Sequence, residues 1–467
     1  MSGVSRPDHF DTVIVGGGSA GVAVAAALGA QLDQRVLLLE AGPAELVAAA
    51  KGLRSVNLFN ALEVPDRQWH TTTVRHHRDG PETAYVRART LGGGSAINAM
   101  VCLPAAAPDF DEWATTYGAT EWSYAHVRSG QEAIVRRSHT VPLGRRDNAV
   151  ADGLRELGWH PTDLAVAGAV GFGPLPLSLD VGGDHPMRRS AVDTYLQPPP
   201  SNLTIRGHAV VQRLHWNSGT VTGVQLHDGT VVSAGRVVSC AGVVGSPMLL
   251  WRSHIDLPGI GLGLQDHPGV SIAVRWREPD DDDTAQGKPA IASGARLSGD
   301  LLLMVMNHAG QSDGSLGALS IALTHPSSRG VLHLRPNGHS VLLPQMLETP
   351  IDRIRMRAGV RHVLELLRTS ALSDAVAEFD GPASVGDDAI DRWVLQHLGD
   401  WYHGTGTSRM GPPDDDLTVV DQTCRVRGFD NLYVIDASVM PTCTAATTAV
   451  AVSVVAERAG AWLARSA

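Results

Sequence analysis

Three glycines early in the chain have the spacing of a nucleotide-binding turn. Gly16, Gly18 and Gly21 form a G-x-G-x-x-G pattern between two apolar runs, 11–15 and 36–39. In such a pattern the first glycine permits a tight turn, the second admits a pyrophosphate, and the third lets a helix pack closely on the sheet. The free N–H groups at the start of that helix attract phosphate.

An acidic residue after the second run completes this pattern. Glu40 follows about 20 residues after the glycines, at the place where a carboxylate accepts hydrogen bonds from a ribose. Strand, glycine turn, helix and strand in this order predict dinucleotide binding, although the spacing alone leaves a merely structural glycine turn open.

A second glycine-rich stretch, RARTLGGGSAIN, spans residues 87–98. A Gly-Gly-Gly-Ser turn that opens an apolar helix is another place where backbone N–H groups converge on an anion or a polarised ring. The same residues could equally form an ordinary junction between a loop and a helix.

The elements that must position these groups belong to a large protein. A length of 467 residues favours two domains or one large interleaved fold. We expect strands at 203–205, 209–214, 223–226 and 236–239 to return to the cofactor domain. Further strands, with an antiparallel-like pattern, are expected at 271–276, 301–306, 318–324 and 331–334. Helices are expected at 351–368 and 446–458. The fold class is therefore mixed α/β.

Composition excludes several kinds of protein. The net charge of −10 argues against nucleic-acid binding. We find neither an apolar run long enough to span a membrane nor a signal-peptide core, and expect a cytoplasmic protein. The four cysteines are scattered and the acidic run 280–283 lacks the spacing of a calcium loop, so we predict reduced thiols and no metal site.

Several motifs in one order identify a family. They are VIVGGGSAG with LLLEAGP, RTLGGGSAIN, GVVGSPMLL with LPGIGLGLQDHP, HGTGTSRMG and NLYVIDASVMP. Together they resemble the glucose-methanol-choline (GMC) family of flavin oxidoreductases over nearly the whole chain. The resemblance implies a Rossmann-like FAD-binding domain (1–104, 181–269 and 399–467) interleaved with a substrate domain (105–180 and 270–398) built on an antiparallel sheet flanked by helices.

The cofactor contacts that the resemblance implies fall on residues of these motifs. The ADP half of FAD would contact Gly16, Gly18, Ser19, Gly21 and Glu40, and its adenine would contact Val210 or Val211. The isoalloxazine and the pyrophosphate would lie near Gly94, Ser95 and Asn98. The ribityl and phosphate groups would lie near Asp436 and Ala437. Some family members attach the flavin covalently through a histidine in the first signature. Residues 95–98 include no histidine, so we expect non-covalent FAD.

The catalytic histidine of the family matches His403. Removing hydride from an alcohol carbon builds positive charge unless the hydroxyl proton leaves, and a histidine can take that proton. Hydride would then pass to flavin N5. The resemblance therefore implies oxidation of an alcohol to an aldehyde or ketone by a small-molecule oxidoreductase.

The second catalytic position of the family, usually His or Asn, differs in this chain. A count without gaps places Thr447 there, with Thr448 beside it. A threonine hydroxyl can hold the substrate oxygen but cannot replace an imidazole as proton acceptor. His403 would then be the single general base. Alternatively, both threonines simply cap the following helix.

Two other functions remain open on the sequence alone. One is a lyase that cleaves a cyanohydrin-like substrate with FAD as a structural element, and the other is a flavin-binding protein without turnover. For the oxidoreductase, the electron acceptor would be dioxygen, a quinone or a redox partner.

Overall fold

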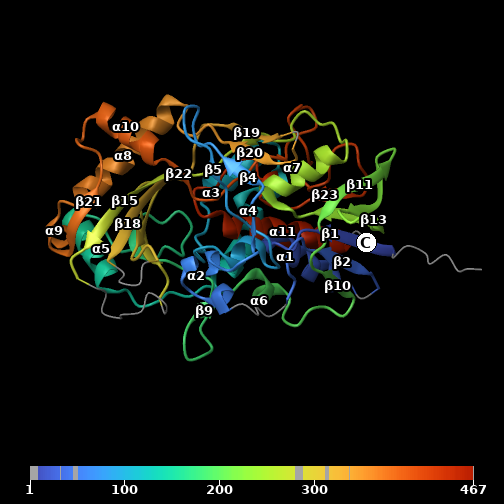
Figure 1. Cartoon of the computed structure of the whole chain (residues 1–467), viewed down its shortest axis with the longest axis horizontal. Helices are drawn as coiled ribbons and strands as arrows, with labels where there is room; N and C mark the ends of the chain where they lie inside the picture. The colour runs from blue at the N-terminus through green and yellow to red at the C-terminus, as the bar shows by residue number, and fades with distance from the viewer. Residues whose placement is uncertain are drawn as a thin grey trace, which may run out of the picture.

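The computed structural model describes residues 9–31, 33–45, 51–278, 288–310, 315–335 and 337–465, and the acidic run 280–283 lies outside these ranges. Figure 1 shows an elongated molecule with a different sheet toward each end of its long axis. Within the described ranges, every helix is too short or too polar to cross a membrane. The four cysteines are buried and free, as predicted.

A parallel sheet forms the end that carries the glycine turn. Its central strand β1 (His9–Val15) lies between β2 (Val36–Leu39) and β13 (Val231–Ser239). β10 (Leu203–Arg206) pairs with β2, and β23 (Leu432–Val434) pairs with β13. Strands buried on both faces read as continuous apolar runs, which is why β1 and β2 were predictable. Three distant parts of the chain therefore meet in one sheet.

Two helices and a hairpin complete this end of the molecule. α1 (Ser19–Gly29) packs against α11 (Thr448–Arg465), where a Cβ on Gly460 would lie 3.1 Å from the Ala27 Cβ atom. Small residues on both helices therefore permit the close approach. β11 (Val211–Asn217) and β12 (Thr220–Leu226) add an antiparallel edge next to β13, so this region returns to the sheet that carries the glycine turn.

An antiparallel sheet forms the other end of the molecule (Figure 1). Its strands in order are β21 (Val376–Asp380), β15 (Pro268–Trp276), β18 (Leu316–Leu323), β17 (Leu301–Met306), β16 (Ile291–Arg296) and β7 (Gly171–Pro174). α8 (Pro350–Leu366) packs on β17 and β18. A parallel sheet beside a helix-flanked antiparallel one confirms the predicted mixed α/β fold class.

A small third sheet joins the two. It contains β14 (Leu262–Leu264), β19 (Gly330–Leu334), β20 (Ser340–Leu343), β4 (Thr72–Val74) and β5 (Thr83–Ala84). The pairing of β4 with β20, some 270 residues later, was not predictable from either short segment. This sheet brings the residues after β5 close to those after β14.

Helix α7 (Gly242–Arg252) contains the whole GVVGSPMLL motif, including Pro247. One local prediction was wrong. Residues 93–102 do not form a helix beyond a single 3₁₀ turn, η2 (Gly93–Ala96). The chain turns away there because Met100 has a φ of 64° and its N–H is held by the Asn98 side chain.

Candidate active site

The glycine turn after β1 has the geometry that its spacing predicted. Gly16 has a φ of 100°, and a Cβ there would lie 2.6 Å from the Cys240 carbonyl oxygen. A Cβ on Gly21 would lie 1.9 Å from the Gly16 carbonyl oxygen. Gly18 precedes the first residue of α1, Ser19, and has no side chain that could accept from the first-turn N–H groups. Those N–H groups therefore stay available for an anion.

Glu40 links this turn to the end of β2. Its Oε2 accepts a hydrogen bond from Gly17 N at 2.9 Å, and its Oε1 accepts one from Gly42 N at 2.8 Å. Burial raises the pKa of this carboxyl, while the two N–H donors oppose the rise. The Glu40 carbonyl accepts from Ala209 N, which brings Val210 and Val211 to the same edge. The predicted adenosine-side residues thus lie together.

The second glycine stretch packs directly on the first. Gly92 N donates to the Gly17 carbonyl at 2.8 Å. Gly93 has a φ of 53°, and a Cβ there would lie 2.6 Å from Gly18 Cα. Gly94, in contrast, borders open space, since a Cβ there would have no described atom within 4 Å. The two predicted anion-binding turns therefore form one cradle.

Ser95 and Asn98 shape this loop. The Ser95 hydroxyl donates to the Gly92 carbonyl at 2.6 Å and accepts from Ala191 N at 2.9 Å. Asn98 Oδ1 accepts from Met100 N and from the Arg188 guanidinium, each at 3.0 Å. Both side chains thus have structural partners, and their contact with a cofactor stays a prediction.

Asp436 connects the start of α7 to the turn after β23. Its Oδ2 accepts from Gly242 N at 2.8 Å and from the Ser246 hydroxyl at 2.6 Å. Its Oδ1 accepts from Ser438 N at 2.8 Å, next to Ala437. Burial raises the pKa of Asp436. The carboxylate therefore fixes the start of α7 against the turn after β23, and its predicted role toward ribityl or phosphate groups stays a prediction.

His403 lies beside a second histidine that the sequence analysis did not select. β22 (Gly399–Asp400) pairs with the start of β15, which brings His403 next to His267. Their Nδ1 atoms are 2.9 Å apart and their rings are inclined by 81°. His267 Nε2 is 3.1 Å from the Thr444 carbonyl oxygen. Burial lowers the pKa of His267 to about 3 and that of the half-buried His403 well below its ordinary value.

Asp266 holds both histidines through their backbone. Its Oδ1 accepts from the N–H groups of His267 and His403, each at 2.8 Å. Its Oδ2 accepts from the Tyr85 hydroxyl at 2.7 Å, and the Arg87 guanidinium contacts that same hydroxyl. Burial, and then the neighbouring Asp400, raise the pKa of Asp266 to about 7. One carboxylate therefore sets the relative position of both imidazoles.

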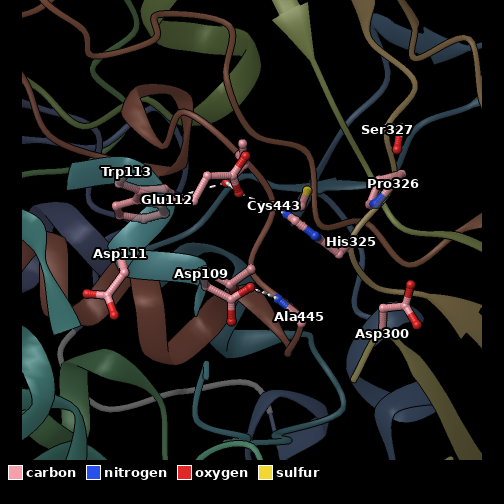
Figure 2. Close-up of polar contacts among 12 residues, drawn as sticks. Asp109, Asp111, Glu112, Trp113, Asp300, His325, Pro326, Ser327, Cys443 and Ala445 are labelled. Carbon is pink, nitrogen blue, oxygen red and sulfur yellow. Dashed lines mark hydrogen bonds and ion pairs between the residues drawn. The ribbon is translucent and has the colours of Figure 1, made fainter. Parts of the chain in front are cut away.

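Thr447 lies buried at the start of the last helix, and its hydroxyl donates to the Val101 carbonyl at 3.1 Å. The loop before it is held by α3 (Ala107–Thr116), as Figure 2 shows. Asp109 Oδ1 accepts from Ala445 N at 2.9 Å, and Trp113 Nε1 donates to the Thr442 hydroxyl at 2.9 Å. A substrate contact of Thr447 stays a prediction.

The sequence analysis missed His267, Asp266, Tyr85 and Arg87. The signal for two of them was present, because Asp266 and His267 stand together in the LPGIGLGLQDHP motif. Their partners are 136 to 181 residues away in the sequence, so spacing could not reveal the cluster. Across the described residues, no group of three or more His, Cys, Asp or Glu is arranged to hold a metal ion.

Known proteins resemble this chain over most of its length. Two family models described as GMC oxidoreductase match residues 10–269 and 326–456. Oxygen-dependent choline dehydrogenase of Photobacterium profundum is 29% identical, over 93% of this chain and 89% of its own. Pyridoxine 4-oxidase of Microbacterium luteolum is 27% identical, over 96% of this chain and 98% of its own.

The fold is also similar to that of a solved structure. The crystal structure of pyridoxine 4-oxidase from Mesorbium loti superimposes with a TM-score of 0.85 at 25% identity, over 97% of this chain and 98% of that one. The two matched family models span most of the chain and include both glycine stretches, His267 and His403. The chain therefore belongs to the GMC oxidoreductase family, as its motifs predicted.

Proposed function

We propose that this GMC oxidoreductase oxidises an alcohol to an aldehyde or ketone, with His403 as the general base. The observation that carries the proposal is His403 itself, a half-buried imidazole held by His267 and Asp266. The relatives choline dehydrogenase and pyridoxine 4-oxidase are named for substrates that are both alcohols. Cyanohydrin cleavage and flavin binding without turnover are not favoured by this match.

The cradle fits the dinucleotide that the family uses. Gly16, Gly18, Ser19 and Gly21 would contact the pyrophosphate, and Glu40 with Val210 or Val211 the adenosine, because these groups converge at one sheet edge. Gly94, Ser95, Asn98, Asp436 and Ala437 would lie along the flavin half. Open space at Gly94, beside the uncapped start of α1, supports this assignment. Residues 95–98 lack a histidine, so we propose that FAD is bound non-covalently.

We also propose the division into domains that the family resemblance implies. Residues 1–104, 181–269 and 399–467 would form the FAD-binding domain, and 105–180 with 270–398 the substrate domain. The assignment is supported by β7, whose pairing with β16 joins the first substrate segment to the second. His403 and His267 would then lie where the two domains meet.

The protein groups supply the proton chemistry. Because burial lowers its pKa, His403 is neutral near pH 7 and can accept a proton. As the alcohol O–H and C–H bonds break and C=O forms, the proton passes to His403. Bound FAD supplies the acceptor for the hydride. Thr447 would hold the substrate oxygen, and the electrons would leave to dioxygen, a quinone or a redox partner.

The test is anaerobic titration of the purified yellow protein with primary, secondary, aryl and sugar alcohols. Bleaching of the flavin bands by one class identifies the substrate, and the rate of recovery in air separates an oxidase from a dehydrogenase. Product formation without bleaching would instead establish the lyase.

His403→Ala should retain FAD and lose turnover by about 10²- to 10⁴-fold, which is the range that general-base catalysis contributes. The flavin absorbance of the variant checks that the protein is folded and loaded. Turnover near the unmodified level would overturn the assignment of His403.

A further inference from the structure

We propose that His267 is a positioning residue that sets the tautomer of His403. Its Nδ1 accepts a hydrogen bond from His403 Nδ1–H, which leaves His403 Nε2 without a hydrogen and able to take a proton. The inference rests on the proposed role of His403 as general base. It gives a role to the buried His267, which takes no direct part in the proposed reaction.

The first step concerns the hydrogen on His267. A backbone carbonyl only accepts, so the 3.1 Å contact with Thr444 O requires hydrogen on His267 Nε2. Burial keeps the pKa of His267 near 3, so the ring is neutral and carries a single hydrogen. His267 Nδ1 therefore presents a lone pair to its neighbour.

The second step concerns His403. Its Nδ1 lies 2.9 Å from that lone pair and must donate. If His267 carried its hydrogen on Nδ1 instead, its Nε2 would present a lone pair to the lone pairs of the Thr444 carbonyl oxygen, and the two would repel each other. A neutral His403 then has no hydrogen on Nε2. Among the residues that the structure describes, no second hydrogen-bond partner occupies the His403 ring.

The third step concerns the carbonyl on which the chain of hydrogen bonds depends. Thr444 lies in a loop whose neighbouring N–H groups are both held. Cys443 N donates to Gln265 Oε1 at 3.0 Å. Ala445 N donates to Asp109 Oδ1 at 2.9 Å (Figure 2). Asp266 fixes the other side through both histidine N–H groups. The backbone therefore determines which nitrogen of His403 is basic.

The same contact supports the protonated state. After His403 accepts the substrate proton, its Nδ1–H faces the neutral His267 and becomes a charge-assisted donor. His267 does not keep this hydrogen, because burial lowers the pKa of His267 to about 3 and so disfavours a positive charge on its ring. In addition to the Asp266 carboxyl, two charged groups lie near these rings and lower their pKa values. Arg87 acts on His403, and His325, which pairs with Glu112 at 3.0 Å, acts on His267.

The first test compares two substitutions of His267 in the FAD-bound protein. His267→Phe removes the acceptor and should lower kcat about 10²-fold with KM within about twofold. His267→Asn places an amide oxygen near the former Nδ1 and should recover most of that loss. Equal kcat for the Phe variant and the unmodified enzyme, or equal losses in both variants, would overturn the inference.

The second test needs no folded variant of His267. In the unmodified oxidised protein labelled with ring-¹⁵N histidine, the His403 signals are those absent from His403→Ala. We expect hydrogen on Nδ1 and none on Nε2, and hydrogen on Nε2 would overturn the inference. If His403→Ala kept its turnover, the proposed function would fail, while this spectrum would still decide the tautomer.

Discussion

At the scale of single residues, the site depends on positions where few other amino acids would fit. Gly93 and Gly94 are neighbours in one turn, yet a side chain at 93 would meet Gly18 and one at 94 would meet open space. Asp266 likewise has three hydrogen-bond donors on two oxygens in a buried position. Each residue therefore predicts a distinct response to substitution.

Substitutions at the two glycines should distinguish an effect on protein stability from an effect on FAD binding. Gly93→Ala should destabilise the FAD-depleted protein by about 1 kcal/mol or more, because alanine is strained at positive φ. Gly94→Ala should change that stability by less than about 0.5 kcal/mol, yet weaken FAD binding, because its Cβ would enter the cradle. Denaturant unfolding and FAD titration measure both effects. Unchanged FAD affinity in Gly94→Ala would contradict the proposed location of the flavin.

Asp266 predicts a pH dependence of stability. A carboxyl with a folded pKa of about 7, against about 3.9 unfolded, stabilises the fold fully below pH 4 and loses that contribution as pH rises to 7. His267 and His403, whose pKa values are lowered, stabilise above about pH 6.5 and lose that contribution as pH falls. The two effects oppose each other between pH 4 and 7.

Asp266→Asn removes the contribution of Asp266 and leaves that of the two histidines. The free energy of unfolding of the variant should therefore fall more steeply than that of the unmodified protein on acidification from pH 7 to pH 4. Denaturant unfolding at four pH values in this window provides the measurement, and parallel curves for the two proteins would refute the prediction.

Sequence reasoning reached only part of this residue-level picture. Gly16, Gly18, Gly21 and Glu40 were predictable because strand, turn and acid follow each other within 30 positions and act through local geometry. The contact between Asp266 and Tyr85 depends on how separate sheets pack, and the two residues are 181 positions apart. A single sequence contains no signal for such a distance.

At the scale of elements, α3 is the helix that holds the active-site loop. Asp109 binds the Ala445 N–H on the loop, and Trp113, one turn later on the same helix, reaches Thr442. Asp111 points away from the loop in Figure 2, is exposed, and binds Tyr124 N at 3.0 Å. The helix thus offers a functional position and a matched control.

Asp109→Ala leaves the buried Ala445 N–H without its acceptor, which should cost about 1–3 kcal/mol of stability. It should also lower kcat, because the Thr444 carbonyl moves with the loop. Asp111→Ala loses a comparable hydrogen bond at the surface and should keep kcat. Calorimetry and steady-state kinetics on both variants check this, and similar kcat values for the two would count against the role of α3.

At the scale of the whole molecule, the two sheets were predictable and their connection was not. Strands with continuous apolar runs, such as β2 and β17, were recognised because burial on both faces leaves that pattern. β16 reads IASGAR and was missed, since its small residues are buried only by pairing with β17 and β7. The small third sheet depends on pairings between short segments that have no pattern of their own.

Binding of FAD should stabilise the entire molecule, because the proposed cradle joins segments from three parts of the chain. A dissociable ligand at 100 times its Kd adds about 2.7 kcal/mol, so the melting temperature should rise with added FAD and fall after its removal. Scanning calorimetry over a range of FAD concentrations tests this. A melting temperature independent of free FAD, with the flavin retained after denaturation, would indicate covalent attachment instead.

The placement of β23 also bears on biosynthesis. This strand lies against β13 in the parallel sheet that carries the glycine turn, and His403 precedes it by fewer than 30 positions. At 5–20 residues per second, a ribosome needs roughly 20 to 80 s to proceed from the glycine turn to this region. During that interval the nascent chain has the glycine turn but neither the completed sheet nor the proposed base, so we expect prematurely terminated chains to lack turnover.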